Sequence, residues 1–222
     1  NTVVGDEAGT AITTGDYNVA VGYDSLTVDT LGGNSVAIGA FALRDQNFTS
    51  ATNAYNVGVG YEAGGSVTTG VQNTVIGSLA GDALTVGQRN VALGKGALTT
   101  DVGGSKSVAI GHSALESQNL GSSDTDSNNV AVGYNAGAGV TTGVQNTLIG
   151  AFAGDATTTA NENTAIGYTA LSANTTAAGN TAVGSRSLLA TTTGATNAGL
   201  GKDSLAANTT GASNTAVGAS AL

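Results

Sequence analysis

The sequence contains no cysteine, proline, methionine or tryptophan, and only 9% of its 222 residues are charged and 4% aromatic. The absence of cysteine excludes disulfides and thiol chemistry. The scarcity of charge argues against an ordinary globular domain, in which about 25% of residues are charged. Six Lys and Arg against fifteen Asp and Glu leave no basic surface for nucleic acid, and no apolar run reaches the roughly 18 residues that span a membrane. We therefore expect no nucleic-acid partner and no direct membrane insertion of this segment.

A five-residue phrase recurs thirteen times, as in NTVVG, SVAIG and NTAVG, and always closes on glycine. Successive closing glycines lie 17 residues apart, except for two spacings of 21 and 22. They are Gly5, Gly22, Gly39, Gly60, Gly77, Gly94, Gly111, Gly133, Gly150, Gly167, Gly184, Gly201 and Gly218. Self-similarity at a fixed period is the signature of a solenoid, in which each repeat forms one coil. We count positions within a coil from its closing glycine, so that −1 precedes the glycine and +1 follows it.

Each phrase predicts one short β-strand. Position −1 is always Val, Ile or Leu, position −3 is Val or Thr in all coils but one, and position −2 is usually Ala or Gly. Alternation of large and small residues is typical of a strand, and β-branched residues favour it. A pair of helices would need about twice the length of this repeat. The sequence therefore predicts an all-β fold, a parallel β-solenoid (β-roll) of thirteen coils. We expect residues 1–222 to form one continuous repeat segment of a longer fibre.

The row at position −2 is almost uniformly small. We expect it to lie opposite a face of Val, Ile and Thr that points into the coil. A row of small side chains would let a second chain approach closely. Such a partner is expected because a thin coil buries little surface on its own. The alternative is that the row faces water. The small residues are Ala20, Ala37, Gly58, Ala92, Ala109, Ala131, Ala165, Ala182, Gly199 and Ala216.

Two further positions co-vary within the chain. Position +4 is Leu in eight coils and Gly in five, and position +7 is polar after Leu but Ile, Val, Leu or Thr after Gly. Protein cores keep their packed volume roughly constant. We therefore predict that one internal slot per coil is filled from either position, so that Leu171 and Val140 occupy equivalent slots.

Position −4 is Asn in eleven coils and Ser in the other two, at Ser35 and Ser107. Identical amides on successive coils can bond to one another along a solenoid, as in Asn ladders. Asn also tolerates the left-handed backbone conformation of turns. We interpret this row as structural.

Residues 34–42 read NSVAIGAFA, and residues 107–114 read SVAIGHSA. This wording resembles the head repeats of trimeric autotransporter adhesins, whose phrase is NSVAIG followed two residues later by Ser or Ala. The NTAVG, AL and NTTG wording of residues 163–222 is also similar to stalk repeats of bacterial surface proteins and phage tail fibres. The resemblance implies a left-handed β-roll with two strands per coil, a homotrimer, and an extracellular location on a cell surface or, for a tail fibre, on a virion.

Two insertions interrupt the period, near residues 44–55 and 116–129. Insertions in solenoids project from one face and often bind partners. The first insertion supplies the candidate recognition residues Arg44, Phe48 and Tyr55. An aromatic stripe at position +1 supplies four more, with packing on an adjacent coil or subunit as the alternative. These four are Tyr23, Tyr61, Tyr134 and Tyr168.

Few residues point to chemistry. His112, the single histidine, occupies the tyrosine position and is interpreted as an outward turn residue. Asp124 and Asp126 lie in the second insertion, where neighbouring oxygens suit calcium. No EF-hand or calcium-binding β-roll motif accompanies them, so we favour a solvated loop. We expect no catalytic residue, no cofactor and no metal.

The sequence thus predicts a structural and adhesive fibre segment that presents a surface to a host or surface receptor, either protein or glycan. A phage tail fibre segment is the main alternative. A polysaccharide-cleaving tailspike needs two placed carboxylates, yet only Asp6 with Glu7 and the Asp124 pair cluster. An ice-binding solenoid needs a regular Thr array, but Val interrupts the Thr row at position −3, which we expect to face inward.

Overall fold

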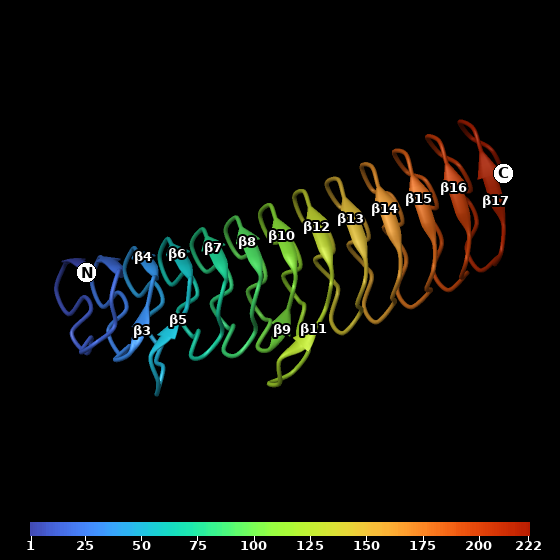
Figure 1. Ribbon diagram of the computed structural model, residues 1–222. Helices are drawn as coiled ribbons and strands as arrows, with labels where there is room; N and C mark the ends of the chain where they lie inside the picture. Colours follow the sequence, from blue (N-terminus) through green and yellow to red (C-terminus); the bar gives the residue numbers. More distant parts are fainter. The chain divides into compact units, whose positions relative to one another are not determined.

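The computed structural model describes residues 1–222 and consists of short strands and turns, without a helix. It therefore contains no helical segment suited to crossing a membrane. Each repeat contributes one three-residue strand at positions −3 to −1 (Figure 1). These strands are β1 (Thr2–Val4), β2 (Val19–Val21), β4 (Val36–Ile38), β6 (Val57–Val59), β7 (Thr74–Ile76), β8 (Val91–Leu93), β10 (Val108–Ile110), β12 (Val130–Val132), β13 (Thr147–Ile149), β14 (Thr164–Ile166), β15 (Thr181–Val183), β16 (Ala198–Leu200) and β17 (Thr215–Val217).

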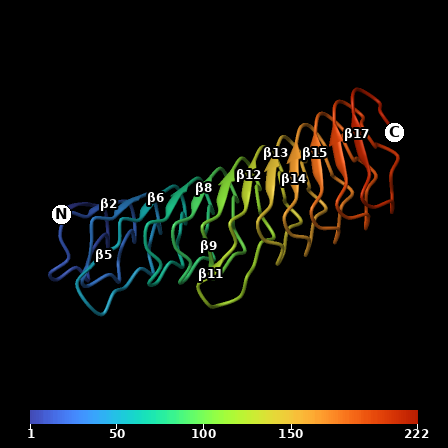
Figure 2. The ribbon, with the colours of Figure 1, turned by 45° about the vertical axis from the view of Figure 1, so that its right-hand side comes forward.

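The chain divides into two units, which are described separately. Unit 1 comprises residues 1–107 and 119–126, and unit 2 comprises residues 108–118 and 127–222. In unit 1 the strands pair in parallel in the order β1-β2-β4-β6-β7-β8. In unit 2 the order is β10-β12-β13-β14-β15-β16-β17, also parallel. Within each unit the strands stand side by side along one wall of the coils (Figures 1 and 2). The predicted parallel β-solenoid with a 17-residue repeat is confirmed.

Equivalent positions of successive coils lie opposite one another. Between β14 and β15, for example, Ala165 pairs with Ala182 and Ile166 with Val183. This register stacks each position of the repeat into a row that runs from coil to coil. A row is therefore the natural unit for judging which residues face the interior.

The expectation about the two faces of the strand is wrong. The alanines at position −2, such as Ala165 and Ala182, are completely buried inside the coil, whereas Ile166 at position −1 is exposed. The physical reason is the thinness of the coil, whose opposite wall approaches the strand closely. A Cβ added to Gly58 would lie 2.9 Å from the Ala63 carbonyl oxygen of its own coil and 2.8 Å from the Leu43 side chain of the preceding coil, so this row is small because it faces the interior.

The larger residues at position +4 or +7 fill the remaining interior, as predicted. Leu171 and Val140 are both completely buried. In the Gly coils the apolar side chain of position +7 turns back over the glycine. A Cβ added to Gly137 would lie 3.4 Å from Val140, and one added to Gly64 would lie 3.3 Å from Val67. Leu at position +4 and an apolar residue at position +7 are therefore alternative ways to fill the same interior volume.

A third source of volume appears at the exceptions to the small row. Val75 and Leu148 are large and buried at position −2. Each lies against the glycine at position +4 of its own coil, since a Cβ on Gly81 would approach Val75 to 2.9 Å and one on Gly154 would approach Leu148 to 2.7 Å. A coil that lacks Leu at +4 can thus admit a larger residue on the strand.

The turns require a left-handed backbone at fixed positions. The closing glycines have φ near +130°, as in Gly167 with +141°, and a Cβ there would lie 2.6 Å from the backbone of Gly184. Position +4 is also left-handed in both coil types, with φ of +56° at Leu171 and +59° at Gly137. The choice between Leu and Gly therefore reflects volume and not backbone conformation. Repeated left-handed residues after the closing glycine also explain why this wall forms turns and not the second strand per coil that the resemblance implied.

The Asn row forms the predicted ladder. Asn163 Nδ2 donates to Asn146 Oδ1 at 3.2 Å and to the Ala177 carbonyl at 3.0 Å, while Asn163 Oδ1 accepts from the Asn180 backbone N–H at 2.9 Å. These amides are buried, so their bonds satisfy groups that would otherwise be costly to remove from water.

Each insertion adds a two-residue parallel pair. In the first, β3 (Gly32–Gly33) pairs with β5 (Thr52–Asn53), and in the second, β9 (Gly104–Ser105) pairs with β11 (Thr125–Asp126). The two insertions thus have the same backbone plan, and differ in the side chains that they carry.

A buried polar network lies beneath the first insertion. The Asp29 carboxylate accepts from the Gly32 backbone N–H at 2.9 Å and from Gln46 Nε2 at 2.5 Å. Gln46 Nε2 also lies 3.1 Å from Ser35 Oγ, and Gln46 Oε1 accepts from Asn56 Nδ2 at 2.8 Å. Ser35 interrupts the Asn row here because Gln46 occupies the space beside it.

Candidate functional site

An aromatic cluster lies on unit 1 at positions +1 and +2. The Tyr23 and Phe41 rings meet edge to face with centroids 5.4 Å apart, and Phe41 meets Tyr61 in the same way at 5.8 Å. The Arg44 guanidinium lies 5.6 Å from the Phe41 ring centroid and pairs with Asp45 at 2.9 Å. A hydrogen bond to Asp45 raises the pKa of Arg44 further above its ordinary value, so the group stays charged. The two tyrosines remain about half exposed.

Unit 2 carries a second aromatic cluster at the same positions. His112 stacks on Tyr134 with centroids 5.4 Å apart, Tyr134 meets Phe152 edge to face at 5.3 Å, and Phe152 meets Tyr168 at 6.4 Å. Edge-to-face pairs of this kind contribute about 0.5–1.5 kcal/mol each beyond burial. His112, Tyr134 and Tyr168 are exposed, so this row combines packing between coils with an accessible aromatic surface.

The sequence prediction missed the two phenylalanines. It placed the stripe at position +1 alone, yet Phe41 and Phe152 at position +2 lie between tyrosines of neighbouring coils. The signal that could have revealed them is a second compensation, because Ala40 and Ala151 leave position +1 small in these two coils. An aromatic ring from the next residue then completes the row.

The three candidates of the first insertion separate in the structure. Arg44 joins the aromatic cluster of unit 1. Phe48 is only 5% exposed and lies over the buried network, where its backbone N–H donates to Asp29 at 3.4 Å, so its ring does not form a recognition surface. Tyr55 is exposed but occupies position −5, as Tyr17 does, and so lies at a different corner of the coil.

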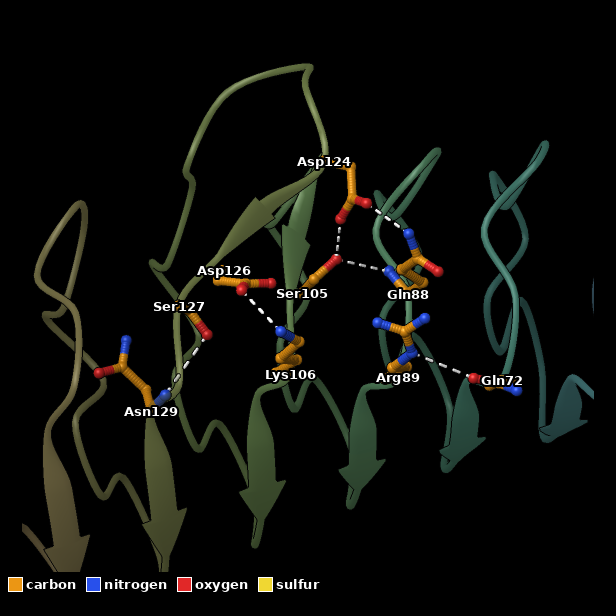
Figure 3. A network of polar contacts seen from close by, with 9 residues as sticks. All are labelled: Gln72, Gln88, Arg89, Ser105, Lys106, Asp124, Asp126, Ser127 and Asn129. Atoms are coloured by element: carbon orange, nitrogen blue, oxygen red, sulfur yellow. Dashed lines mark hydrogen bonds and ion pairs between the residues drawn. The ribbon is translucent and has the colours of Figure 1, made fainter.

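Polar contacts tie the second insertion to the preceding coils (Figure 3). The Asp124 carboxylate accepts hydrogen bonds from Ser105 Oγ and Gln88 Nε2, and the Gln88 backbone N–H donates to Ser105 Oγ at 2.8 Å. Lys106 Nζ pairs with Asp126 at 2.6 Å. The bond from Ser105, assisted by Gln88, lowers the pKa of Asp124. Because Asp124 and Asp126 bind different protein groups, they do not converge on one point.

No cluster of three or more His, Cys, Asp or Glu side chains is arranged to hold a metal ion. The acidic groups instead serve local contacts. Asp203 pairs with Arg186 at 2.6 Å, and this hydrogen bond lowers the pKa of Asp203. Asp155 differs, because burial raises its pKa and its Oδ1 atom has no hydrogen-bond partner.

The fold and these surfaces define a β-solenoid repeat protein that carries an aromatic cluster at positions +1 and +2 of each unit. Comparison with protein-family models, with curated proteins and with solved structures finds no match to the chain.

Proposed function

We propose that the chain is a structural and adhesive fibre segment of a bacterial cell surface, assembled as a homotrimer and without enzymatic activity. The observation that carries this proposal is the unpartnered apolar row at position −1. Its exposed fractions run from 36% at Ile149 to 41% at Leu93 in five interior coils. The other interior residues of the row are half-buried, and an exposed apolar row of this kind is typical of an interface.

A second copy of the chain suits this row better than an unrelated partner. Two copies share the same 17-residue spacing, so their side chains can match coil by coil along the whole contact. Val and Thr at position −3 flank the apolar row, and charged residues are absent from both rows. This corrects the sequence-based expectation, because the contact would use the Val and Ile rows and not the buried Ala row.

Analytical ultracentrifugation of the chain tests the assembly. We expect a species of three times the 21.2 kDa chain mass at about 1–10 µM protein. Ile149→Ser combined with Ile166→Ser should shift it toward the monomer, whereas Val144→Ser, outside the strands, should not. A folded, stable monomer of the unaltered chain at these concentrations would refute the trimer.

The aromatic stripe is the proposed receptor-contacting surface. Tyrosine offers a rigid apolar ring with a polar tip, which suits both protein and glycan receptors. Beads coated with the chain should be retained on a mucin-coated surface, and Tyr134→Ala with Tyr168→Ala should reduce that retention. Tyr55→Ala, which changes an exposed tyrosine outside the stripe, is the matched control. Retention that is equal for all three proteins would contradict this role.

A phage tail fibre segment is the alternative setting, since the same surfaces serve attachment of a virion. The sequence that flanks residues 1–222 discriminates the two, with a membrane-anchoring barrel in the first case and a virion attachment domain in the second. In both settings, incubation with mucin polysaccharide should release no oligosaccharide. Specific release by the purified chain would overturn the non-enzymatic proposal.

The outward direction of position −3 favours ice binding as a second candidate. Thr147, Thr164 and Thr181 occupy consecutive coils in register and are partly accessible, contrary to the inward direction expected from the sequence. Val, and Ala198, interrupt the row elsewhere. Thermal hysteresis of a chain solution would support this candidate, and its absence would exclude it.

A further inference from the structure

A groove of about 370 Å³ lies beside the first insertion on unit 1. Its lining includes Asp16 and Tyr17 from one coil, Asn34 from the next, and Thr52 and Asn53 from β5. This size is near the lower end of the range for small-molecule sites, about 300–1,000 Å³. None of the lining residues is cationic, so the groove offers no attraction to an anion.

The second insertion has the same backbone plan but carries different side chains at the equivalent positions. Counted from the closing glycines, Asp124 stands where the first insertion has Ala51. Its carboxylate reaches Gln88 and Ser105. Their equivalents in the coils beside the first insertion are Asp16 and Gly33. Beside the second insertion, therefore, a carboxylate of this chain is held by two side-chain donors.

The first insertion reverses this chemistry. Ala51 has no polar side chain to place in the groove, and Asp16 supplies an acceptor where Gln88 supplied a donor. Lys106 and Arg89, in the coils beside the second insertion, are replaced by Asn34 and Tyr17 beside the first. The open groove thus disfavours an anion and suits a ligand that is rich in hydrogen-bond donors.

The side chains present also define how such a ligand would be held. Tyr17 is 79% exposed and offers a free ring face. Asn34 Nδ2 donates to Asn53 Oδ1 at 2.9 Å, which leaves the Asn34 carbonyl oxygen and the Asn53 amide nitrogen directed to other partners. A carboxylate, two amides and an aromatic ring around a small groove match the hydroxyls and the apolar face of a pyranose ring.

We propose that the groove formed by Asp16, Tyr17, Asn34 and Asn53 binds one neutral sugar unit of a glycan. The Tyr17 ring covers the apolar face of the sugar, Asp16 accepts from its hydroxyls, and the two amides bond to the remaining hydroxyls. This site names a ligand class for the proposed adhesive function and rests on it, but it lies apart from the position −1 row. Sugar binding can therefore be measured in the isolated chain whether or not trimers form or beads adhere.

Saturation-transfer NMR with the methyl glycosides of glucose, galactose, mannose and N-acetylglucosamine tests the proposal. We expect transfer to at least one of these neutral sugars, with a Kd near 1 mM or weaker. Methyl N-acetylneuraminate, the anionic probe, should show none. Absence of transfer to all four neutral sugars, or transfer only to tetramethylammonium as a cationic probe, would overturn the proposal.

Variants locate the binding within the chain. Tyr17→Ala should weaken it by about tenfold or more, whereas Tyr55→Ala, at the same position of another coil but outside the groove, should leave it unchanged. The double variant Asp16→Gln with Ala51→Asp introduces equivalents of Gln88 and Asp124 and should abolish binding by placing a carboxylate in the groove. Each variant must keep the circular dichroism spectrum and melting temperature of the parent. Binding that persists at parental strength in the folded Tyr17→Ala chain refutes the site.

Discussion

The two faces of each three-residue strand obey different constraints. On the inner face, position −2 meets the opposite wall of its own coil and is limited to Ala or Gly unless that wall also carries glycine. On the outer face, positions −1 and −3 carry Val, Ile, Leu and Thr without such a limit. The comparison shows that in so thin a solenoid the small residues form the core of the wall, and the large residues remain on the outer face, where they are partly exposed.

Truncation of Leu171 should have the largest effect, because it empties the interior slot. Leu171→Ala is expected to lower the free energy of unfolding by about 2–5 kcal/mol, as buried Leu truncations do. Urea denaturation at fixed protein concentration measures it. Leu189→Ala, at a half-buried position that directly follows the slot residue Leu188 of the next coil, is the control and should cost less. A loss below about 1 kcal/mol for Leu171→Ala would mean that the slot collapses or is not filled by this residue.

Enlargement of the inner face should come next. Ala182→Leu is expected to destabilise the chain by about 1–3 kcal/mol, because extra methyl groups in a packed core force displacements. Val183→Leu, one residue along the same strand on the outer face, should change stability by no more than about 0.5 kcal/mol. Equal effects of the two substitutions, measured as shifts of the urea midpoint, would break the distinction between the faces.

The sequence predicted the solenoid and the interior slot but not which face of each strand points into the coil. The 17-residue period and the exchange between Leu at +4 and an apolar residue at +7 are both visible within one chain, because each coil must keep its own volume. The inward face could not be recognised, since positions −1, −2 and −3 are mostly apolar or small and lack the usual contrast of an apolar inner and a polar outer face. Only the distance to the opposite wall decides it, as at Gly58.

The candidate sites, like the fold, were predictable only in part from the sequence. Tyr23 and Tyr134 belong to the aromatic rows as expected, but Phe41 entered from position +2, and the repeat spacing alone does not show which neighbouring rings meet. The groove at the first insertion could not be foreseen at all. It depends on the parallel pairing of β3 and β5, which brings together residues about 20 apart that no repeat connects.

A smaller effect is expected at Asp155, which is half-buried, between the interior and the solvent. Burial raises its pKa, so the folded state binds the proton more tightly than the unfolded state does. Stability should therefore fall as pH rises from about 4, the unfolded value, through the raised pKa of the folded state. Asp155→Asn should remove this fall and gain up to about 1 kcal/mol at neutral pH, since water still screens the exposed part of the carboxylate.

Urea midpoints between about pH 3 and 7 measure the effect at Asp155. Asp203→Asn provides a control of opposite sign, because the hydrogen bond from Arg186 lowers the pKa of Asp203 and the ionised form is the one that is stabilised. If Asp155→Asn reproduced the parental pH dependence, the buried Oδ1 atom would have no energetic consequence.

The smallest effect on the single chain should come from the outer face itself. Ile166→Ser removes an apolar side chain that is already 37% exposed, so under dilute conditions that favour monomers it should change the free energy of unfolding by only about 0.5 kcal/mol. Ala165→Ser, its neighbour on the inner face, places a hydroxyl in a fully buried row and should cost more.

In the proposed trimer the order reverses, because Ile166 then becomes buried against a sister chain. Melting curves over a hundredfold range of protein concentration would show this as a loss of stability for Ile166→Ser that grows with concentration. A loss that is large and independent of concentration would place Ile166 in the core of the single chain and remove the difference between the faces.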